Sequence, residues 1–175
     1  PHERATTARL AERGADETVL VTRAIDGDTI RLASGELVRY IGVDTPETRR
    51  RVGDRWVEDP EPFGREAAEA NRRWVEGKRV RLEYDVQRRD RYGRVLAYVY
   101  VAGGMVPPPA CPPPADCSAT GRNAGGGMIN AKLLEEGFAK LLTIPPNVKY
   151  VDQFRQAVQA ARDNRRGVWN DTDRR

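Results

Sequence analysis

Three short runs rich in β-branched residues, close together in the first part of the chain, limit its possible folds more than any other feature. They cover 18–25, 29–33 and 37–43, and two turn signals separate them, Asp26-Gly27 and then Ser34-Gly35. An Asp-Gly pair between two such runs is a strong β-hairpin signal. We therefore expect a three-strand meander that carries carboxylates at its turns and ends.

Two further strands and about three helices are expected after this meander. Alternating apolar residues predict strands over 80–84 and 95–101, and the second should be central because both of its faces are apolar. Apolar positions at helical spacing predict a helix over 63–74, and later helices are expected over 128–136 and 151–165. Five strands as a meander, together with these helices, favour an α+β fold in which a five-stranded OB-fold β-barrel carries about three α-helices.

The length of 175 residues suits one domain with its own hydrophobic core. We place that domain at 18–170, between an N-terminal arm at 1–17 and a C-terminal tail at 171–175. The charged, Pro-containing stretch at 49–62 should be a long exposed loop. The Pro/Gly-rich stretch at 103–127 cannot pack a core and should be an insertion.

The scarcity of histidine is the feature of the composition that most limits the possible catalytic sites. The chain has a single histidine, His2, so sites built on histidine are excluded and a general base has to be a carboxylate, a Tyr or a Lys. No apolar run approaches about 18 residues, so no membrane span is expected. The 30 Lys and Arg exceed the 26 Asp and Glu, and the resulting net charge of +4 suits a polyanionic partner.

The two cysteines, Cys111 and Cys117, lie together in the Pro/Gly-rich stretch. They are too few for a zinc site. A small local disulfide would indicate an oxidising compartment, and a pair of free thiols is the alternative. The chain starts at Pro1 rather than Met, which is consistent with a removed leader. We therefore expect a secreted, cell-envelope or periplasmic protein.

Two acidic motifs, at 26–28 and 44–47, supply candidate metal ligands. Ca²⁺ binds carboxylate and carbonyl oxygens in a loose shell that water completes. Asp28 and Asp44 are the candidate side-chain ligands, the Thr45 carbonyl is a third, and Asp26 could lie in the outer shell. Taken singly, each motif has a simpler interpretation: an Asp-Gly turn for the first, and Thr45 capping a helical turn for the second.

Glu47 and two arginines complete a candidate catalytic set. Glu47 could act as the general base on a water near a bound metal. Arg39 and Arg94 could neutralise a phosphate and the charge that develops on it. Each of the three is also compatible with an ordinary solvated surface residue. In combination they point to metal-assisted cleavage of a phosphodiester bond.

Arg39 sets the main geometric condition on this set. It shares the strand parity of Leu37 and Ile41, so it is expected to face the inside of the barrel, where a charge needs a partner. Strict alternation sends Arg39 and Asp44 to opposite faces of the strand. A bulge or bend near Gly42 would bring them to the same side.

The order of these motifs resembles the staphylococcal nuclease (thermonuclease) family. The resemblance spans 18–170 outside the insertion, and three motifs in one order are specific where any one of them is not. The strong matches are 24–29, 39–47 and 90–98, and the weaker ones are 63–67, 128–130 and 167–169.

The resemblance implies an OB-fold nuclease that uses Ca²⁺ to hydrolyse DNA and RNA and leaves 3′-phosphate ends. It implies that Asp28, Asp44 and the Thr45 carbonyl bind calcium and that Glu47 activates water. It makes Arg39 and Arg94 the pair that grips the phosphate. The expected substrate is single-stranded or locally melted DNA and RNA, with little sequence preference. A monomer with no obligate protein partner and no membrane association is expected.

One departure from the family pattern concerns base stacking. Family members often carry tyrosines just after the segment that corresponds to 137–140, whereas this chain continues with aliphatic residues and prolines. Stacking would then fall to Tyr92 or Tyr150. Two other functions remain as alternatives. One is a non-catalytic module that binds nucleic acid or protein, and the other is a barrel with a purely structural Ca²⁺ site.

Overall fold

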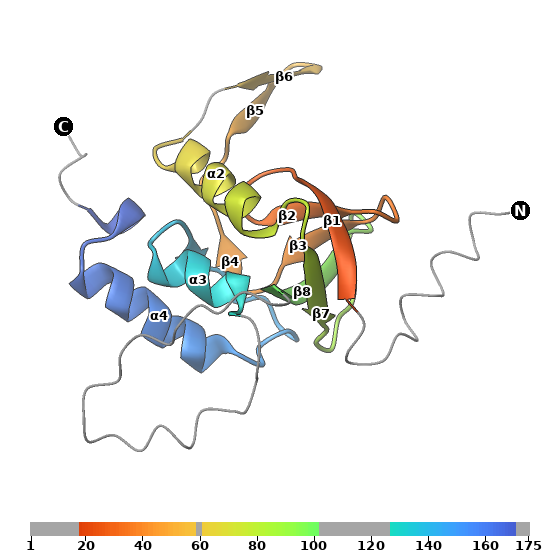
Figure 1. Ribbon diagram of the computed structural model, residues 1–175. Helices are drawn as coiled ribbons and strands as arrows, with labels where there is room; N and C mark the ends of the chain where they lie inside the picture. The colour runs from red at the N-terminus through yellow and green to blue at the C-terminus, as the bar shows by residue number, and fades with distance from the viewer. Residues whose placement is uncertain (1–17, 59–60, 102–126, 171–175) are drawn as a thin grey trace, which may run out of the picture.

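The computed structural model describes residues 18–58, 61–101 and 127–170. The N-terminal arm, almost all of the predicted insertion with Cys111 and Cys117, and the C-terminal tail lie outside the described residues. Within the described part, five strands close into a barrel and three α-helices pack around one end of it (Figure 1). The predicted five-stranded barrel with about three helices is therefore confirmed.

The barrel strands pair in an order that differs from the predicted meander. Its members in spatial order are β1 (Thr18–Ala24), β2 (Thr29–Leu32), β3 (Leu37–Tyr40), β8 (Val95–Val101) and β7 (Arg79–Glu83). The first three form the expected antiparallel meander, but β3 pairs with β8 in parallel. The prediction of a five-strand meander was wrong, because β8 fills the gap between β3 and β7 and so leaves the sheet without a free edge.

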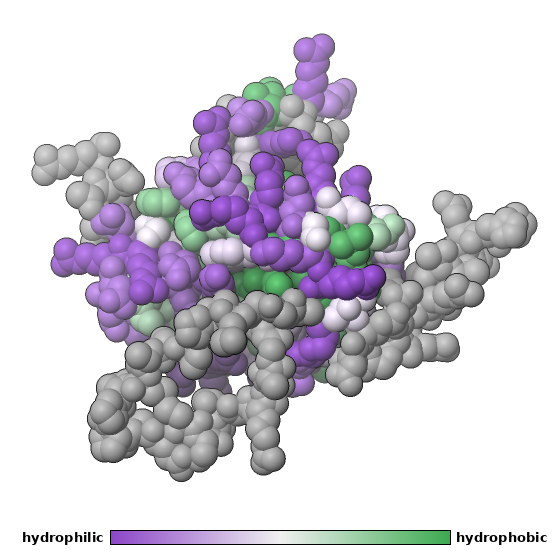
Figure 2. All heavy atoms as spheres, viewed as in Figure 1, coloured by the Kyte–Doolittle hydropathy of each residue, from purple (hydrophilic) through white to green (hydrophobic). Residues whose placement is uncertain are grey.

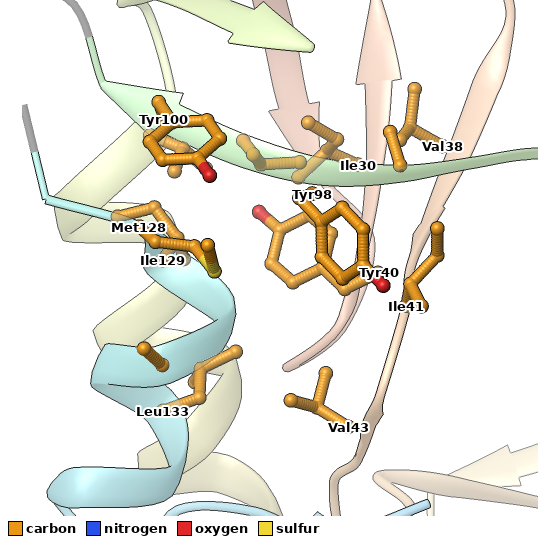
Figure 3. Packing of buried hydrophobic residues seen from close by; sticks show 14 of the residues in the cluster. Ile30, Val38, Tyr40, Ile41, Val43, Tyr98, Tyr100, Met128, Ile129 and Leu133 are labelled. Carbon is orange, nitrogen blue, oxygen red and sulfur yellow. The ribbon is translucent and has the colours of Figure 1, made fainter. Parts of the chain in front are cut away.

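The barrel interior follows the period-two alternation of its strands. Ile30 on β2 lies opposite Val38 on β3, and both are fully buried. Tyr40 continues the buried row on β3 (Figure 3), opposite Ala97 of β8, so the ring of the next residue, Tyr98, is buried against the outside of the barrel. Alternation of apolar residues in the sequence therefore does identify the inward face of the two strands.

Three α-helices lie outside the barrel: α2 (Gly64–Val75), α3 (Ile129–Glu135) and α4 (Val151–Asp163). Buried residues of α3 face the same cluster as the barrel rings (Figure 3). A 3₁₀ turn, η2 (Gly167–Trp169), follows α4. No helix among the described residues is long and apolar enough to cross a membrane.

The stretch predicted as a long exposed loop at 49–62 contains a hairpin, so that prediction was wrong. Strand β5 (Arg49–Val52) pairs with β6 (Arg55–Glu58), and the hairpin projects from the body of the molecule (Figure 1). Gly53 and Asp54 form its two-residue loop, and Gly53 has a positive φ of 59°. A Gly-Asp pair is a known two-residue hairpin signal, but the charged flanks lack the apolar alternation that identifies strands.

The predicted strand at 37–43 is divided into two. Strand β3 ends at Tyr40, and a separate short strand, β4 (Val43–Asp44), pairs with β9 (Lys140–Leu141). Gly42 lies between them with a φ of 82°, in the left-handed region that favours glycine. This break sets the direction in which the second acidic motif leaves the barrel.

Candidate active site

Asp28 lies in the turn between β1 and β2, where it is almost completely buried. Its backbone N–H donates to Oδ1 of Asp26 at 3.1 Å, so Asp26 shapes the turn. Gly27 is required between them because a Cβ there would lie 2.7 Å from the Thr45 side chain. The Asp-Gly turn and the candidate ligand are therefore one feature, and the simpler turn interpretation does not compete with it.

Thr45 is held by Asp28 and does not cap a helix. Its backbone N–H and its Oγ1 both donate to Asp28 Oδ2 at 2.9 Å. No helix begins here, since the chain runs through 45–47 without regular structure. The helix-cap alternative is therefore wrong, and the two acidic motifs are joined directly at this point.

Arg39 bridges both candidate metal ligands. Its Nη1 lies 2.8 Å from Asp28 Oδ2 and its Nη2 lies 3.1 Å from Asp44 Oδ1. Nη1 also donates to the Val43 carbonyl at 2.9 Å. One guanidinium thus fixes the two carboxylates relative to each other, although one comes from the β1–β2 turn and the other from β4.

The expectation that Arg39 faces the barrel interior was wrong. Val38 and Tyr40 point inward, so Arg39 lies on the outer face, opposite Thr29 of β2 and Leu96 of β8. The error arose because Leu37 and Ile41 were taken to face inward, whereas Leu37 is only half-buried on the outer face and Ile41 lies beyond the end of β3. The expected partner is nevertheless present, and the Arg39 side chain is only 15% exposed.

The bend that the sequence required at Gly42 is present. A Cβ at this position would collide with the Phe154 ring, and the positive φ disfavours other residues as well. Because the chain turns here, Asp44 returns to the side of Arg39 rather than to the opposite face. Asp44 itself stays accessible, with 54% of its side chain exposed.

Glu47 lies at the exposed edge of the carboxylates. Its backbone carbonyl accepts from the Glu61 N–H at 2.8 Å, and its N–H donates to Glu61 Oε2 at 3.3 Å. Helix α2 begins against it, since a Cβ on Gly64 would lie 2.7 Å from the Glu47 carbonyl oxygen. The backbone that carries Glu47 is thus fixed, while its side chain faces solvent.

Two carboxyl groups of this cluster, those of Asp28 and Glu47, have raised pKa values. Burial is the main cause for Asp28, whose pKa rises to about 6 although Arg39 opposes the shift. The Glu47 pKa is also raised, first by partial burial and then by the charges of Asp28 and Asp44. A carboxylate with a raised pKa accepts a proton more readily, which suits a general base.

Arg94 lies in the turn between β7 and β8, where Asp90 holds it. Its Nε is 2.7 Å from Asp90 Oδ2, and Asp90 Oδ1 accepts the N–H groups of Tyr92 and Arg94. Burial alone would raise the Asp90 pKa, but these hydrogen bonds and the Arg94 charge lower it. The Arg94 guanidinium also lies over the exposed Tyr92 ring, 5.4 Å from its centroid.

Arg39, Arg94 and Tyr92 border one cavity of about 440 Å³, which we call the first hollow. Leu96, Leu142 and Ile144 form its apolar wall. Tyr150 does not border it. Its hydroxyl donates to Glu83 Oε1 at 2.7 Å, and its ring meets Tyr98 edge to face. The structure thus brings Tyr92 to the arginine pair but not Tyr150.

The donor set suits a hard divalent cation such as Ca²⁺. Asp28 and Asp44 present carboxylate oxygens around one positive group, Arg39, so the site already tolerates cationic charge. In the part of the chain that is described, no three His, Cys, Asp or Glu side chains group as a metal site. Carbonyl oxygens and water would therefore have to complete the shell, as expected from the sequence.

Two buried asparagines for which the sequence predicted no role hold the site in place. Asn71 on α2 donates to the Asp26 carbonyl at 2.8 Å and accepts from the Tyr40 hydroxyl at 2.8 Å. Asn130 on α3 donates to the Ile41 carbonyl at 2.8 Å. The available signal was an amide on the apolar face of each predicted helix, since a buried amide needs partners.

Comparison with known proteins places these features in a family. The family model for staphylococcal nuclease homologues matches residues 37–171. A thermonuclease of Staphylococcus hyicus is 35% identical over 159 residues, which are 89% of this chain and 77% of that protein. A thermonuclease of Staphylococcus intermedius is 36% identical over 157 residues, 87% of this chain and 76% of the relative. The endonuclease YncB of Bacillus subtilis is 36% identical over 87% of this chain and 61% of its own length.

Proposed function

The chain belongs to the family of staphylococcal nuclease homologues, and from that premise we propose that it is a Ca²⁺-dependent nuclease that cleaves DNA and RNA with little sequence preference. It is an enzyme that hydrolyses phosphodiester bonds in nucleic acids. The observation that carries the proposal is the position of Arg39, which joins Asp28 to Asp44 at the edge of the hollow that Arg94 also borders.

Asp28 and Asp44 would hold the Ca²⁺ ion, together with the Thr45 carbonyl. The bound ion supplies positive charge that offsets the charge developing on the phosphate and makes a nearby water easier to deprotonate. Asp26 supports this arrangement through the hydrogen bond that fixes the Asp28 backbone.

Glu47 acts as the general base. It takes a proton from a water molecule while the water oxygen attacks phosphorus, and the bond from phosphorus to the 5′ oxygen breaks. The 5′ oxygen takes up a proton from solvent, so the products are a 3′-phosphate on one fragment and a 5′-hydroxyl on the other. The accessible Glu47 side chain and its raised pKa support this role.

Arg39 and Arg94 bind the phosphate and stabilise the additional charge in the transition state. Each guanidinium is oriented by a carboxylate before the substrate arrives, Arg39 by Asp28 and Asp44 and Arg94 by Asp90. Groups oriented in advance do not have to reorganise during the reaction, which makes their charge more effective.

The first hollow accommodates one nucleotide of an unpaired strand. Its volume of about 440 Å³ and its apolar wall suit a nucleobase, with the Tyr92 ring available for stacking. A base enters such a hollow only when it is not paired, so single-stranded or locally melted DNA and RNA are the substrates. We further propose that the protein acts as a monomer and is secreted or located in the cell envelope, where abundant calcium suits a water-rich site.

The test is digestion of single-stranded DNA and RNA by the purified protein with Ca²⁺, with Mg²⁺ and with a chelator. We expect cleavage with Ca²⁺, no cleavage with the chelator, and fragments that a 3′-phosphatase can modify. Nucleic-acid binding without metal-dependent cleavage would support the non-catalytic alternative. A calcium-dependent melting temperature with neither binding nor cleavage would support the structural-calcium alternative.

A further inference from the structure

A second cavity borders segment 43–47 at Pro46 and shares no lining residue with the first hollow. It has a volume of about 680 Å³, and we call it the second hollow. Pro46, next to Glu47 in the chain, borders it, as does Glu61, which bonds the Glu47 backbone. Lys140 also borders it and pairs with Asp44 across the β4–β9 sheet. Segment 39–46 therefore runs from the first hollow, past the carboxylates, to the second.

Most of the charged residues that line the second hollow are cationic. Lys140, Arg162 and Arg165 contribute three positive charges, and Glu61 is the one acidic residue in the lining. Figure 2 shows hydrophilic residues gathered over the end of α4 that leads to η2, the segment that carries the two arginines. Such a surface attracts a polyanion.

These cations are not neutralised by carboxylates within the described chain. No ion pair joins Lys140, Arg162 or Arg165 to an acidic side chain among residues 18–58, 61–101 and 127–170. Arg162 instead lies over the Trp169 ring, 4.2 Å from its centroid. Their charge thus remains available to a ligand.

The location of the second hollow next to the catalytic residues indicates that its ligand is the substrate strand. A strand whose cleaved phosphate lies between Arg39 and Arg94 extends in two directions, and the first hollow takes the nucleotide on one side only. On the other side Pro46, next to the general base Glu47 in the chain, borders the second hollow together with the three cations. Phosphates spaced along that strand match cations spaced along this surface.

We propose that the second hollow binds the sugar-phosphate backbone of the substrate strand on the far side of the cleaved bond from the first hollow. This inference rests on the proposed nuclease function and assigns the substrate contacts that the catalytic set leaves open. Lys140 and Arg165 neutralise phosphates, and Trp169 keeps the Arg162 guanidinium at the edge of the hollow.

The double variant Lys140→Gln/Arg165→Gln tests the proposal, because neither side chain makes an ion pair or ring contact in the described structure. Binding of a fluorescent 20-nucleotide oligo(dT) is followed by anisotropy across a salt series in a Glu47→Gln background, which keeps the strand intact. We expect affinity to fall about tenfold at low salt. We also expect the slope of log affinity against log salt to become shallower by about 1.4, or about 0.7 for each lost phosphate contact.

The matched control is Arg79→Gln/Arg155→Gln, which removes the same charge from two exposed arginines that border neither hollow. Its salt slope should equal that of the parent. Equal slopes for the test and control variants would overturn the proposal, as would displacement of the oligonucleotide by polyglutamate of the same charge. If the double variant folds poorly, Arg165→Gln alone should lower the slope by about 0.7, and an unchanged slope counts against the proposal.

The binding readout separates this inference from the proposed function. Absence of cleavage by the wild-type protein would contradict the nuclease mechanism but would leave the salt slopes interpretable. Normal cleavage by the wild-type protein, together with equal salt slopes in the test and control variants, would overturn only the proposal that the second hollow binds the strand.

Discussion

The two hollows beside the carboxylates differ in how their cations are held. In the first, Arg39 contacts Asp28 and Asp44, and Arg94 contacts Asp90. In the second, Lys140 and the arginines beside it have no carboxylate partner among the described residues. A cation oriented by a carboxylate presents its charge at a fixed point, which a transition state requires. A solvated cation attracts phosphates from a distance but fixes no geometry.

The first hollow is therefore equipped for chemistry and the second for holding a strand. Mutations in the two hollows should therefore affect different properties of the enzyme. Changes between the hollows or in the first should lower turnover, whereas changes in the second should lower affinity and its salt dependence. Single substitutions at these positions test this division.

Glu47→Gln should lower kcat by about 10²–10⁴-fold, because the amide cannot take the proton from water. Steady-state cleavage of single-stranded DNA measures the loss, and oligonucleotide binding should be retained because the cations of both hollows are unchanged. Glu69→Gln, on the exposed face of α2, is the control. Turnover close to wild type in Glu47→Gln would remove Glu47 from the mechanism.

Arg39→Lys should lower kcat by about 100-fold. A Lys ammonium cannot span Asp28 and Asp44 as the planar guanidinium does, so both the carboxylates and the phosphate lose their fixed contact. Arg31→Lys on the exposed side of β2 is the matched control. If lysine supports normal turnover, position 39 contributes only a charge, and the contrast between the hollows disappears.

Calcium should stabilise the fold, and a chelator should remove that stabilisation. An ion that binds only the folded state at 100 times its Kd adds about 2.7 kcal/mol to the free energy of unfolding. Thermal melts with Ca²⁺ and with a chelator measure the shift in Tm. Asp44→Asn should abolish the shift in Tm. Asp152→Asn should keep it, because the Asp152 side chain on α4 is 90% exposed. A shift that persists in Asp44→Asn would place the ion elsewhere.

Asp90→Asn should lower kcat/KM about three- to fivefold, because a partly exposed ion pair contributes at most about 1 kcal/mol. The change leaves Arg94 in place but weakens the contact that orients it. Cleavage kinetics measure the effect, with Asp163→Asn as the control. A loss in Asp163→Asn equal to that in Asp90→Asn would show that orientation of Arg94 has no role.

The ion pair between Asp90 and Arg94 should also make a small, pH-dependent contribution to the free energy of unfolding. The pKa of Asp90 is lower in the folded state than in the unfolded state. The stabilisation is therefore present above the unfolded-state pKa of about 4 and is lost as pH falls through the folded-state pKa. The unfolding free energy of wild type should thus exceed that of Asp90→Asn by less than about 1 kcal/mol at neutral pH. Urea titrations at neutral and acidic pH measure the difference, which should shrink in acid. A difference that grows in acid would contradict the assignment.

Much of the fold was accessible from local sequence patterns. The barrel strands and the three helices follow from apolar alternation, helical spacing and glycine turns, because these signals act between neighbouring residues. The hairpin at β5 and β6 was missed because charged residues obscured its alternation. The parallel pairing of β3 with β8 was missed because no local signal specifies which distant edge a strand will meet.

The candidate site shows the same limit. The acids and arginines were identified as a set, but the sequence put Arg39 on the wrong face. Asn71 donates to the Asp26 carbonyl, which lies 45 residues away in the chain. The sequence predicted no role for it, because this contact forms only when the chain is folded. The second hollow likewise combines segments near 46, 61, 140 and 165.

The sequence by itself determined the chemistry available to this protein: one histidine, two acidic motifs, two candidate arginines and a glycine where a bend was needed. The tertiary structure alone decided how these groups meet. The left-handed bend at Gly42 brings Asp44 back to Arg39, and the packing of distant segments forms the two hollows next to the carboxylates. The reason is physical, because residue types fix charge and local conformation, whereas distances between remote groups are set by packing of the whole chain.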